Sequence, residues 1–260
     1  MTDLGFEGLN VHWSTSEDMH EVEDGSVQSV ITSPPYWDLK DYGHENQIGT
    51  ADESYEHYHD RMEAVWSECY DVLKDNGTMW VVVDTVMDNG DLQLLPYHIA
   101  ERAEDVGFHL QDMVAWYKPT AIAGMTARNV VNKKEYVVFL SKSKDFKLNI
   151  DSESNNGLED PAISEERLLG NIWRHPVKRG SAGKNVLHKA PYPISLIDRI
   201  VRLSSDEKDT VLDPFLGSGT TAYSALNLGR ACIGYELNKE FEDIIIDRLS
   251  DLQQKSLTEF

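Results

Sequence analysis

The clearest chemical signal in the sequence is a glycine-rich turn near its C-terminal end, within VLDPFLGSGTTAYSALNLGRACIGYE. Gly217, Gly219 and Ala222 fit the G-x-G-x-x-G/A pattern of nucleotide-binding α/β units, and Glu236 ends the strand that follows. In such units the glycines let a ligand approach the backbone, and the acidic residue accepts hydrogen bonds from ribose hydroxyls. Because Asp213, a proline and an aromatic residue precede the glycines, the turn suits an adenosyl ligand that carries an amino acid better than a pyrophosphate.

A second chemical stretch is VITSPPYWDL, in which a β-branched run ends in Ser33-Pro34-Pro35-Tyr36. Two adjacent prolines donate no backbone hydrogen bonds and cannot continue a helix, so regular structure ends there. Ligands of open α/β sheets bind at the carboxyl ends of strands. After Glu236 there is room for only one helix and a tail, so the other strands must come from upstream. We therefore expect the strand that ends at Ser33 to lie beside the glycine-rich turn.

Segments with helical and with strand-like spacing alternate along the chain. The expected helices are residues 58–73, with Asn76-Gly77 as the stop signal, and residues 96–106, 193–203, 218–228 and 240–252. The expected strands are residues 27–32, 78–85, 108–118, 135–142, 210–215 and 231–236. Several of these strands are apolar throughout, which predicts an α/β fold with a mostly parallel sheet and helices on both faces. We expect a single domain over residues 1–260, in which residues 119–132 and 145–190 form loops or a small subdomain.

Composition narrows the class of protein. Hydrophobic residues make up 40% of the chain, which is typical of a globular protein. The sequence has no apolar run long enough for a membrane span and no signal-peptide pattern, so we expect a cytoplasmic protein without membrane contact. Cys69 and Cys232 have no partner spacing and are interpreted as core thiols, and no metal site is expected. The net charge of −21 favours a halophilic protein over an acidic mesophilic one.

The charge is unevenly distributed along the chain. Residues 171–189 contain five Lys or Arg and no acid, and residues 118–147 contain seven basic residues against two acids. Basic stretches that persist in so acidic a protein suggest an anionic partner, with nucleic acid as the first candidate. The alternative is that these lysines and arginines are simply solvated loop residues. The candidate DNA contacts are Arg128, Lys133, Arg174, Lys178, Arg179 and Lys184, with Lys134 beside them.

Taken together, these motifs resemble those of the amino-methylating DNA methyltransferases. The order of the motifs is similar to that of the permuted (beta-class) subgroup, in which the catalytic motif precedes the S-adenosylmethionine motif. TSPPYW resembles the catalytic motif, VLDPFLGSGTT the cofactor loop and GRACIGYEL the ribose-binding strand. GTMWVVVDT and EYVVFLSK resemble the middle strands, and HKAPYPISLIDRIV the segment before the cofactor strand. The resemblance covers nearly the whole chain and implies a Rossmann-like methyltransferase fold with circularly permuted motif order.

The resemblance implies S-adenosyl-L-methionine as cofactor and assigns residues to it. The cofactor loop, the ribose-binding strand and the segment that encloses the methionine end supply Asp213, Pro214, Phe215, Gly217, Ser218, Gly219, Thr220, Glu236, His188 and Tyr192. One departure concerns a Gly-Asp pair that family members often carry before the catalytic motif and that is thought to touch the adenine. This sequence has Trp13-Ser14 at about that place, and Ser14 could still hydrogen-bond the adenine.

The expected catalytic residues are Ser33, Pro34, Pro35 and Tyr36, with Asp84 in second place. An exocyclic amine is a poor nucleophile, because its lone pair is delocalised into the base. Ser33 Oγ and the Pro34 carbonyl could accept both amino hydrogens, while Tyr36 stacks on the flipped base. Asp84 could orient the amine or Ser33, or it could simply cap the end of its strand.

Within the resemblance, Ser33 at the first catalytic position favours cytosine N4 over adenine N6 as the target amine. The expected partner is double-stranded DNA, and the subgroup suggests a homodimer and a cognate restriction endonuclease. Three alternatives remain at this point: a nicotinamide oxidoreductase that uses the glycine turn, a methyltransferase of RNA or protein, and a DNA-binding module without catalytic activity. A P-loop NTPase is disfavoured because the turn has no Gly-Lys-Ser/Thr.

Overall fold

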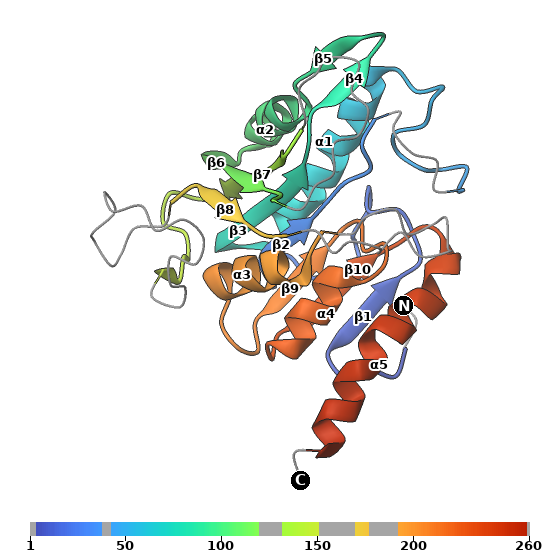
Figure 1. Cartoon of the computed structure of the whole chain (residues 1–260), viewed down its shortest axis with the longest axis vertical. Coiled ribbons are helices and arrows are strands. Elements are labelled where there is room, and N and C mark those ends of the chain that lie inside the picture. Colours follow the sequence, from blue (N-terminus) through green and yellow to red (C-terminus); the bar gives the residue numbers. More distant parts are fainter. Residues whose placement is uncertain (1–3, 38–42, 120–131, 151–169, 177–191, 259–260) are drawn as a thin grey trace.

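The computed structural model describes residues 4–37, 43–119, 132–150, 170–176 and 192–258 of the 260 residues, with the side chains of 253–258 left aside. Each predicted helix and strand has a counterpart in the structure (Figure 1). The strands are β1 (Leu9–His12), β2 (Val27–Thr32), β3 (Leu73–Val83), β4 (Val86–Asp88), β5 (Asp91–Gln93), β6 (His109–Tyr117), β7 (Lys134–Ser141), β8 (Ile172–Arg174), β9 (Thr210–Asp213) and β10 (Ala231–Tyr235). The helices are α1 (Tyr55–Val72), α2 (Leu95–Val106), α3 (Ile194–Ser204), α4 (Thr220–Asn227), the 3-10 turn η2 (Lys239–Phe241) and α5 (Glu242–Thr258). Of these elements, β1, β4, β5 and β8 are strands that the sequence did not predict.

The described strands form one eight-stranded sheet in the order β1-β10-β9-β2-β3-β7-β6-β8, and a separate β4–β5 hairpin. Within the eight-stranded sheet, β7 is antiparallel to both of its neighbours and the other neighbouring pairs are parallel. Strands that are far apart in the sequence therefore have their carboxyl ends on the same side of the sheet, which is where α/β proteins bind ligands. The predicted fold class is confirmed: a mostly parallel, Rossmann-like sheet with helices on both faces.

Two buried clusters lie on the two faces of this sheet. α1 and α2 cover one face, where Met62, Trp66 and Ile99 are fully buried against β2 and β3. α3, α4 and α5 cover the other face, where Ile197 and Ile245 are fully buried. Figure 1 shows α1 and α2 on one side of the sheet and α3, α4 and α5 on the other. Because both faces are packed, the central strand β2 is buried along its whole length.

The boundary between α1 and β3 differs from the expected one. The stop signal Asn76-Gly77 lies inside β3, and α1 ends at Val72. Leu73 already pairs with Val27 of β2, and the Asn76 side chain accepts a hydrogen bond from Gln28 Nε2 at 3.2 Å. Sheet pairing therefore overrides the local helix-stop signal, as tertiary context commonly overrides local propensity.

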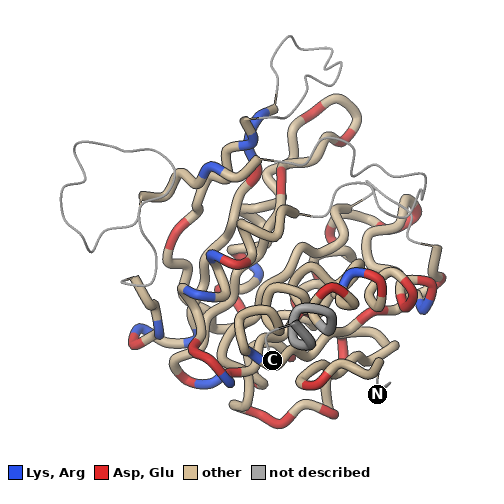
Figure 2. Tube along the Cα trace, turned by 60° about the horizontal axis from the view of Figure 1, so that its bottom comes forward, with Lys and Arg blue, Asp and Glu red and all other residues tan. Residues whose placement is uncertain are grey.

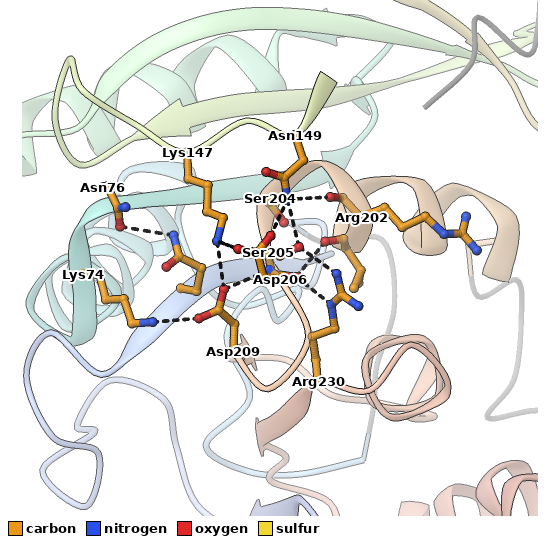
Figure 3. Close-up of polar contacts among 12 residues, drawn as sticks. Lys74, Asn76, Lys147, Asn149, Arg202, Ser204, Ser205, Asp206, Asp209 and Arg230 are labelled. Carbon is orange, nitrogen blue, oxygen red and sulfur yellow. Dashed lines mark hydrogen bonds and ion pairs between the residues drawn. The ribbon is translucent and has the colours of Figure 1, made fainter. Parts of the chain in front are cut away.

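A polar cluster lies at the opposite side of the sheet from Ser33, where the parallel strands begin (Figure 3). Asp209, just before β9, accepts from Lys74 Nζ of β3 at 2.8 Å and from Lys147 Nζ at 3.3 Å. Lys147 also pairs with Asp206, which accepts from Asn149 Nδ2 at 2.9 Å. These contacts tie the β3 half of the sheet to the β9 half. Elsewhere acidic residues are spread over much of the trace (Figure 2).

In the described part of the chain, no helix is long and apolar enough to cross a membrane. The same residues contain no group of three or more His, Cys, Asp or Glu that could hold a metal ion. Cys69 and Cys232 are free and buried, and burial raises the pKa of both thiols.

Candidate active site

The two chemical stretches of the sequence meet in the middle of the sheet. β2, which leads into Ser33, pairs directly with β9, which leads into the glycine-rich turn. Thr32 Oγ1 donates a 2.7 Å hydrogen bond to Asp213 Oδ1, and both residues have no exposed surface. The prediction that the strand ending at Ser33 lies beside the cofactor strand is confirmed.

Both carboxylate oxygens of Asp213 accept hydrogen bonds from protein groups where β2 and β9 meet. Its Oδ1 also accepts from the Phe215 amide at 3.0 Å, and its Oδ2 accepts from the Tyr192 hydroxyl at 3.2 Å. Tyr192 in turn lies 2.6 Å from Thr221 Oγ1 at the start of α4. Burial raises the pKa of Asp213, while the Thr32 hydroxyl and the other donors oppose that shift. The carboxylate thus fastens the glycine turn to β2, α4 and the segment before α3.

The glycine-rich turn has the backbone conformation that its residues predict. Gly217 and Gly219 have positive φ angles of 49° and 77°, where a side chain is disfavoured. A Cβ on Gly219 would lie 3.3 Å from Ile245 of α5. α5 also supports the turn through Arg248, whose Nε donates to Ser218 O at 2.7 Å. The sequence gives no signal for Arg248, because its partner lies 30 positions away on another element.

Glu236 lies directly after β10 and faces the turn. Its Oε2 accepts from the Gly217 amide at 2.9 Å, and its Oε1 accepts from the Asn238 amide at 2.8 Å. Burial raises the pKa of Glu236 to about 7, and the two amides oppose that shift. A carboxylate has about four lone-pair sites, so Glu236 can still accept a hydrogen bond from a ligand beside its backbone donors, which include the Leu237 amide. This arrangement suits a ligand that carries hydroxyl groups.

β1 brings Ser14 to the same corner, although the sequence analysis did not predict this strand. β1 pairs with β10, and the Glu236 amide donates to His12 O at 3.0 Å. Ser14, which follows β1 by two residues, therefore lies near the acidic end of β10. β1 was missed because it has only four residues and carries the polar Asn10 and His12.

The Ser33–Tyr36 loop offers two acceptors. Ser33 is half-buried and Pro34 is buried. Among the described residues, none hydrogen-bonds Ser33 Oγ or the Pro34 carbonyl, whereas the Pro35 carbonyl accepts from the Tyr58 hydroxyl at 2.9 Å. Tyr36 is partly buried against the α1 side of the sheet. A serine hydroxyl and a proline carbonyl therefore stand at the end of β2, beside the cofactor strand.

Asp84 lies at the end of β3, on the other side of β2. Thr32 pairs with Val81, so Asp84 is three residues further along the neighbouring strand. Its carboxylate accepts from the Thr85 amide at 2.8 Å, from Asn132 Nδ2 at 2.6 Å and from Lys134 Nζ at 3.4 Å. With these three donors, Asp84 organises the start of β7 as well as the end of β3.

Comparisons with known proteins bear directly on this arrangement. A family model described as DNA methylase matches residues 27–247. The chain belongs to the DNA methylase family. The type II methyltransferase M.MthZI from Methanothermobacter thermautotrophicus is 32% identical to it over 93% of this chain and 76% of its own length. The protein is accordingly an S-adenosyl-L-methionine-dependent DNA amino-methyltransferase.

Solved structures show the same fold. TTHA0409 from Thermus thermophilus, in complex with S-adenosyl-L-methionine, has a TM-score of 0.67 and 27% identity, and the match covers 93% of this chain and 95% of that one. PvuII DNA methyltransferase (cytosine-N4-specific) has a TM-score of 0.74 with 19% identity, over 93% of this chain and 88% of that one. The second likeness supports the fold alone.

The residues of this methyltransferase fit its cofactor. The positive φ angles of the turn allow a close approach to the backbone, and Glu236 can accept from ribose hydroxyls. Thr220 Oγ1 at the start of α4 is buried and, within the described part of the chain, has no hydrogen-bond partner. A buried hydroxyl without a partner is costly, so a ligand group that pairs with it would be favoured. His188 lies outside the described residues.

The basic residues divide into paired and exposed ones. Lys118 pairs with Glu135 at 2.6 Å, Lys134 with Asp84, and Lys133 Nζ donates to Pro119 O at 3.4 Å. Arg174 at the end of β8 is exposed and has no side-chain partner among the described residues. β8 runs parallel to β6, so Arg174 lies at the same edge of the sheet as Ser33. The other candidate DNA contacts, Arg128, Lys178, Arg179 and Lys184, lie outside the described residues.

Proposed function

We propose that the chain is a site-specific DNA methyltransferase whose target is the exocyclic N4 amine of a flipped cytosine. The observation that carries this proposal is the pair of acceptors at the end of β2. Ser33 Oγ and the Pro34 carbonyl face no described hydrogen-bond partner and lie one strand away from the cofactor turn. An amine with two hydrogens is the complement of two such acceptors.

The chemistry follows from these acceptors. By accepting the amino hydrogens, Ser33 and Pro34 draw the nitrogen lone pair away from the ring and towards the methyl donor. When bound, S-adenosyl-L-methionine supplies the methyl group from its sulfonium. The amine nitrogen gains the bond to carbon, the carbon–sulfur bond breaks, and a proton then leaves the nitrogen. Positioning supplies much of the rate, because the loop holds both acceptors in place before the base arrives.

The target amine lies inside the duplex, so the base must be extruded. Tyr36 follows the two prolines and provides a ring face on which the base can stack. Pro35 stiffens the loop, since its φ angle is fixed. Asp84, directly after the neighbouring strand β3, is the second-rank candidate, and its role would be to orient the amine or Ser33.

The cofactor is held by residues from four elements. Glu236 accepts hydrogen bonds from the ribose hydroxyls. The backbone of the glycine-rich turn lies against the cofactor, and Ser14 lies near its adenine. The other proposed contacts are Asp213, Pro214, Phe215, Gly217, Ser218, Gly219, Thr220, His188 and Tyr192. Of these, Asp213 and Tyr192 act indirectly, because their polar atoms bond to each other and to Thr32, Phe215 and Thr221.

Cytosine is preferred over adenine because of Ser33. In the permuted amino-methyltransferases that the motif order resembles, Ser at this position goes mainly with N4 methylation of cytosine, and Asp or Asn mainly with N6 methylation of adenine. Adenine N6 is the second candidate, since the family includes both activities.

The test is to expose unmethylated DNA to the protein with S-adenosyl-L-methionine, in low salt and in molar salt. The DNA is then sequenced by a method that distinguishes N4-methylcytosine from N6-methyladenine. Methylcytosine at one short sequence supports the proposal, and methyladenine replaces it with the second candidate. Calorimetry with S-adenosyl-L-methionine and with NAD runs beside it. Binding of NAD alone would overturn the proposal.

Several expectations accompany this function. Residues 1–260 form a single methyltransferase domain, in which residues 119–132 and 145–190 serve target recognition. Duplex DNA is the substrate, a homodimer is the expected assembly, and a cognate restriction endonuclease is the expected biological partner. The protein works in salty cytoplasm, where phosphate contacts are weak and base contacts must contribute more.

A further inference from the structure

Helix α1 donates a hydrogen bond to the backbone of the Ser33–Tyr36 loop. Tyr58, in the first turn of α1, is fully buried and donates to the Pro35 carbonyl at 2.9 Å. A proline has a fixed φ angle, so the conformation of Pro35 depends on its ψ angle alone. The carbonyl oxygen moves with ψ, and the same rotation turns the peptide that carries Tyr36. A hydrogen bond to Pro35 O therefore sets the direction in which Tyr36 leaves the loop.

The segment before α1 holds the next residue of the loop. Trp37 Nε1 donates to the carbonyl of Glu53 at 2.8 Å, and the Glu53 carboxylate accepts from the Gly49 amide at 2.6 Å. Gly49 has a φ of +83°, and a Cβ there would lie 3.3 Å from the Tyr36 carbonyl. The segment before α1 therefore packs closely against Tyr36 and Trp37, next to the peptide that Tyr58 holds.

The same face of α1 holds the loop after β1. Arg61 donates to both carboxylate oxygens of Glu17, at 2.9 and 2.6 Å, and Glu68 accepts from the Met19 amide at 2.7 Å. Residues 58, 61 and 68 are spaced so that they share one side of a helix. One rigid helix thus contacts both the base-holding loop and the loop at the adenine end of the cofactor turn.

We propose that Tyr58 is a positioning residue for methyl transfer, which fixes the Ser33–Tyr36 loop through the Pro35 carbonyl before DNA binds. This inference rests on the proposed function of that loop. Tyr58 does not touch the base or the cofactor. Its hydroxyl makes the loop rigid, so that Ser33 Oγ and the Pro34 carbonyl meet the amine without rearrangement.

The test compares Tyr58→Phe with Tyr70→Phe. Tyr70 lies on the same helix, and its hydroxyl has no hydrogen-bond partner among the described residues, so its removal is a matched control. The measurements are the single-turnover rate of methyl transfer at saturating cofactor and DNA, the Kd for S-adenosyl-L-methionine, and hydrogen exchange at the Tyr36 and Trp37 amides.

For Tyr58→Phe we expect a rate about tenfold lower and faster exchange at both amides, with the Kd changed by no more than about twofold. Tyr70→Phe should match the wild type in all three. An unchanged rate and unchanged exchange in Tyr58→Phe would overturn the inference, as would equal losses in the two variants. If the wild type methylates no DNA, the proposed function fails, while the exchange measurement still decides whether Tyr58 fixes the loop.

Discussion

Thr32 Oγ1 and Asp213 Oδ1 are 2.7 Å apart in the buried centre of the sheet, although 181 positions separate the two residues in the sequence. The bond joins β2, which leads into Ser33, to β9, which leads into the glycine-rich turn. Asp213 is fully buried, so its carboxylate depends on its donors for stabilisation. One side-chain contact therefore helps to fix the position of the Ser33–Tyr36 loop relative to the glycine-rich turn.

Thr32→Val should lower the free energy of unfolding by about 1–3 kcal/mol, because a buried carboxylate loses a donor while the shape of the side chain is kept. Urea unfolding measures the change. Thr32→Ser retains the hydroxyl and should lose less. Equal stability of Thr32→Val and wild type would show that the bond contributes nothing.

Ser33→Ala should lower the rate of methyl transfer by about a hundredfold while the affinity for S-adenosyl-L-methionine holds, because it removes one acceptor for the amine and no cofactor contact. Ser29→Ala on the same strand is the matched control. The Ser29 hydroxyl is buried and has no partner in the described structure, so its removal should leave the rate unchanged. Full activity in Ser33→Ala would place the base elsewhere.

The affinity for S-adenosyl-L-methionine should rise with pH through about 7, the value to which burial raises the pKa of Glu236. Protonation places a hydrogen on one carboxyl oxygen of Glu236, so only the carboxylate form is purely an acceptor for the ribose hydroxyls. Each pH unit below 7 should weaken binding by up to about tenfold, and Glu236→Gln should bind more weakly but without this slope. Calorimetry between about pH 6 and pH 8 measures both proteins.

The raised pKa of Glu236 also affects the stability of the cofactor-free protein, and here the expected change with pH is opposite to that of the affinity. The ordinary pKa is 4.5, so between 4.5 and about 7 the folded state binds more protons at Glu236 than the unfolded state does. This residue therefore makes the free energy of unfolding decrease as the pH rises through that window. Glu236→Gln should remove that contribution, and unfolding curves at several pH values would reveal an unchanged slope if the assignment is wrong.

Arg174→Ala should weaken DNA binding about equally for all sequences and reduce the dependence of log K on log salt by about 1, if the exposed guanidinium contacts a phosphate. Lys144→Ala removes the same charge from an exposed residue after β7, at the opposite edge of the sheet. It should leave the slope unchanged. Titrations at several salt concentrations measure both, and identical slopes would exclude Arg174 from the interface.

Asp209→Asn should destabilise the fold by about 1–3 kcal/mol without changing cofactor affinity, because Asp209 binds Lys74 and Lys147 at the edge of the sheet away from Ser33. Asp105→Asn, an exposed acid of α2, is the control and should be neutral. Thermal unfolding and calorimetry separate the two effects. A large loss of cofactor affinity would mean that this edge communicates with the site.

Features that depend on neighbouring residues in the sequence could be predicted from the sequence alone. The predicted strand at residues 27–32 has the bounds of β2, because its β-branched run stops at two prolines. Gly217 and Gly219 have the positive φ angles that their pattern predicts. The neighbouring positions of β2 and β9 also followed, because a sheet needs more strands than the C-terminal segment could supply.

Other features depended on the tertiary structure. The short, polar strand β1 and the edge strand β8 carry no strong periodic signal, and pairing with β10 and β6 alone makes them strands. At Asn76-Gly77 the local signal favoured a turn, and pairing with β2 overrode it.

The sequence by itself determined which residues are the candidates for the chemistry, because strand ends, turns and glycine φ angles are local properties. Only the tertiary structure decided which residues hold them: Thr32 and Tyr192 on Asp213, Arg248 on Ser218, and Tyr58 on Pro35. The physical reason is that a hydrogen bond acts over about 3 Å in space, whatever the separation in sequence. Strand order and helix placement bring such partners together, and no spacing along the chain records them.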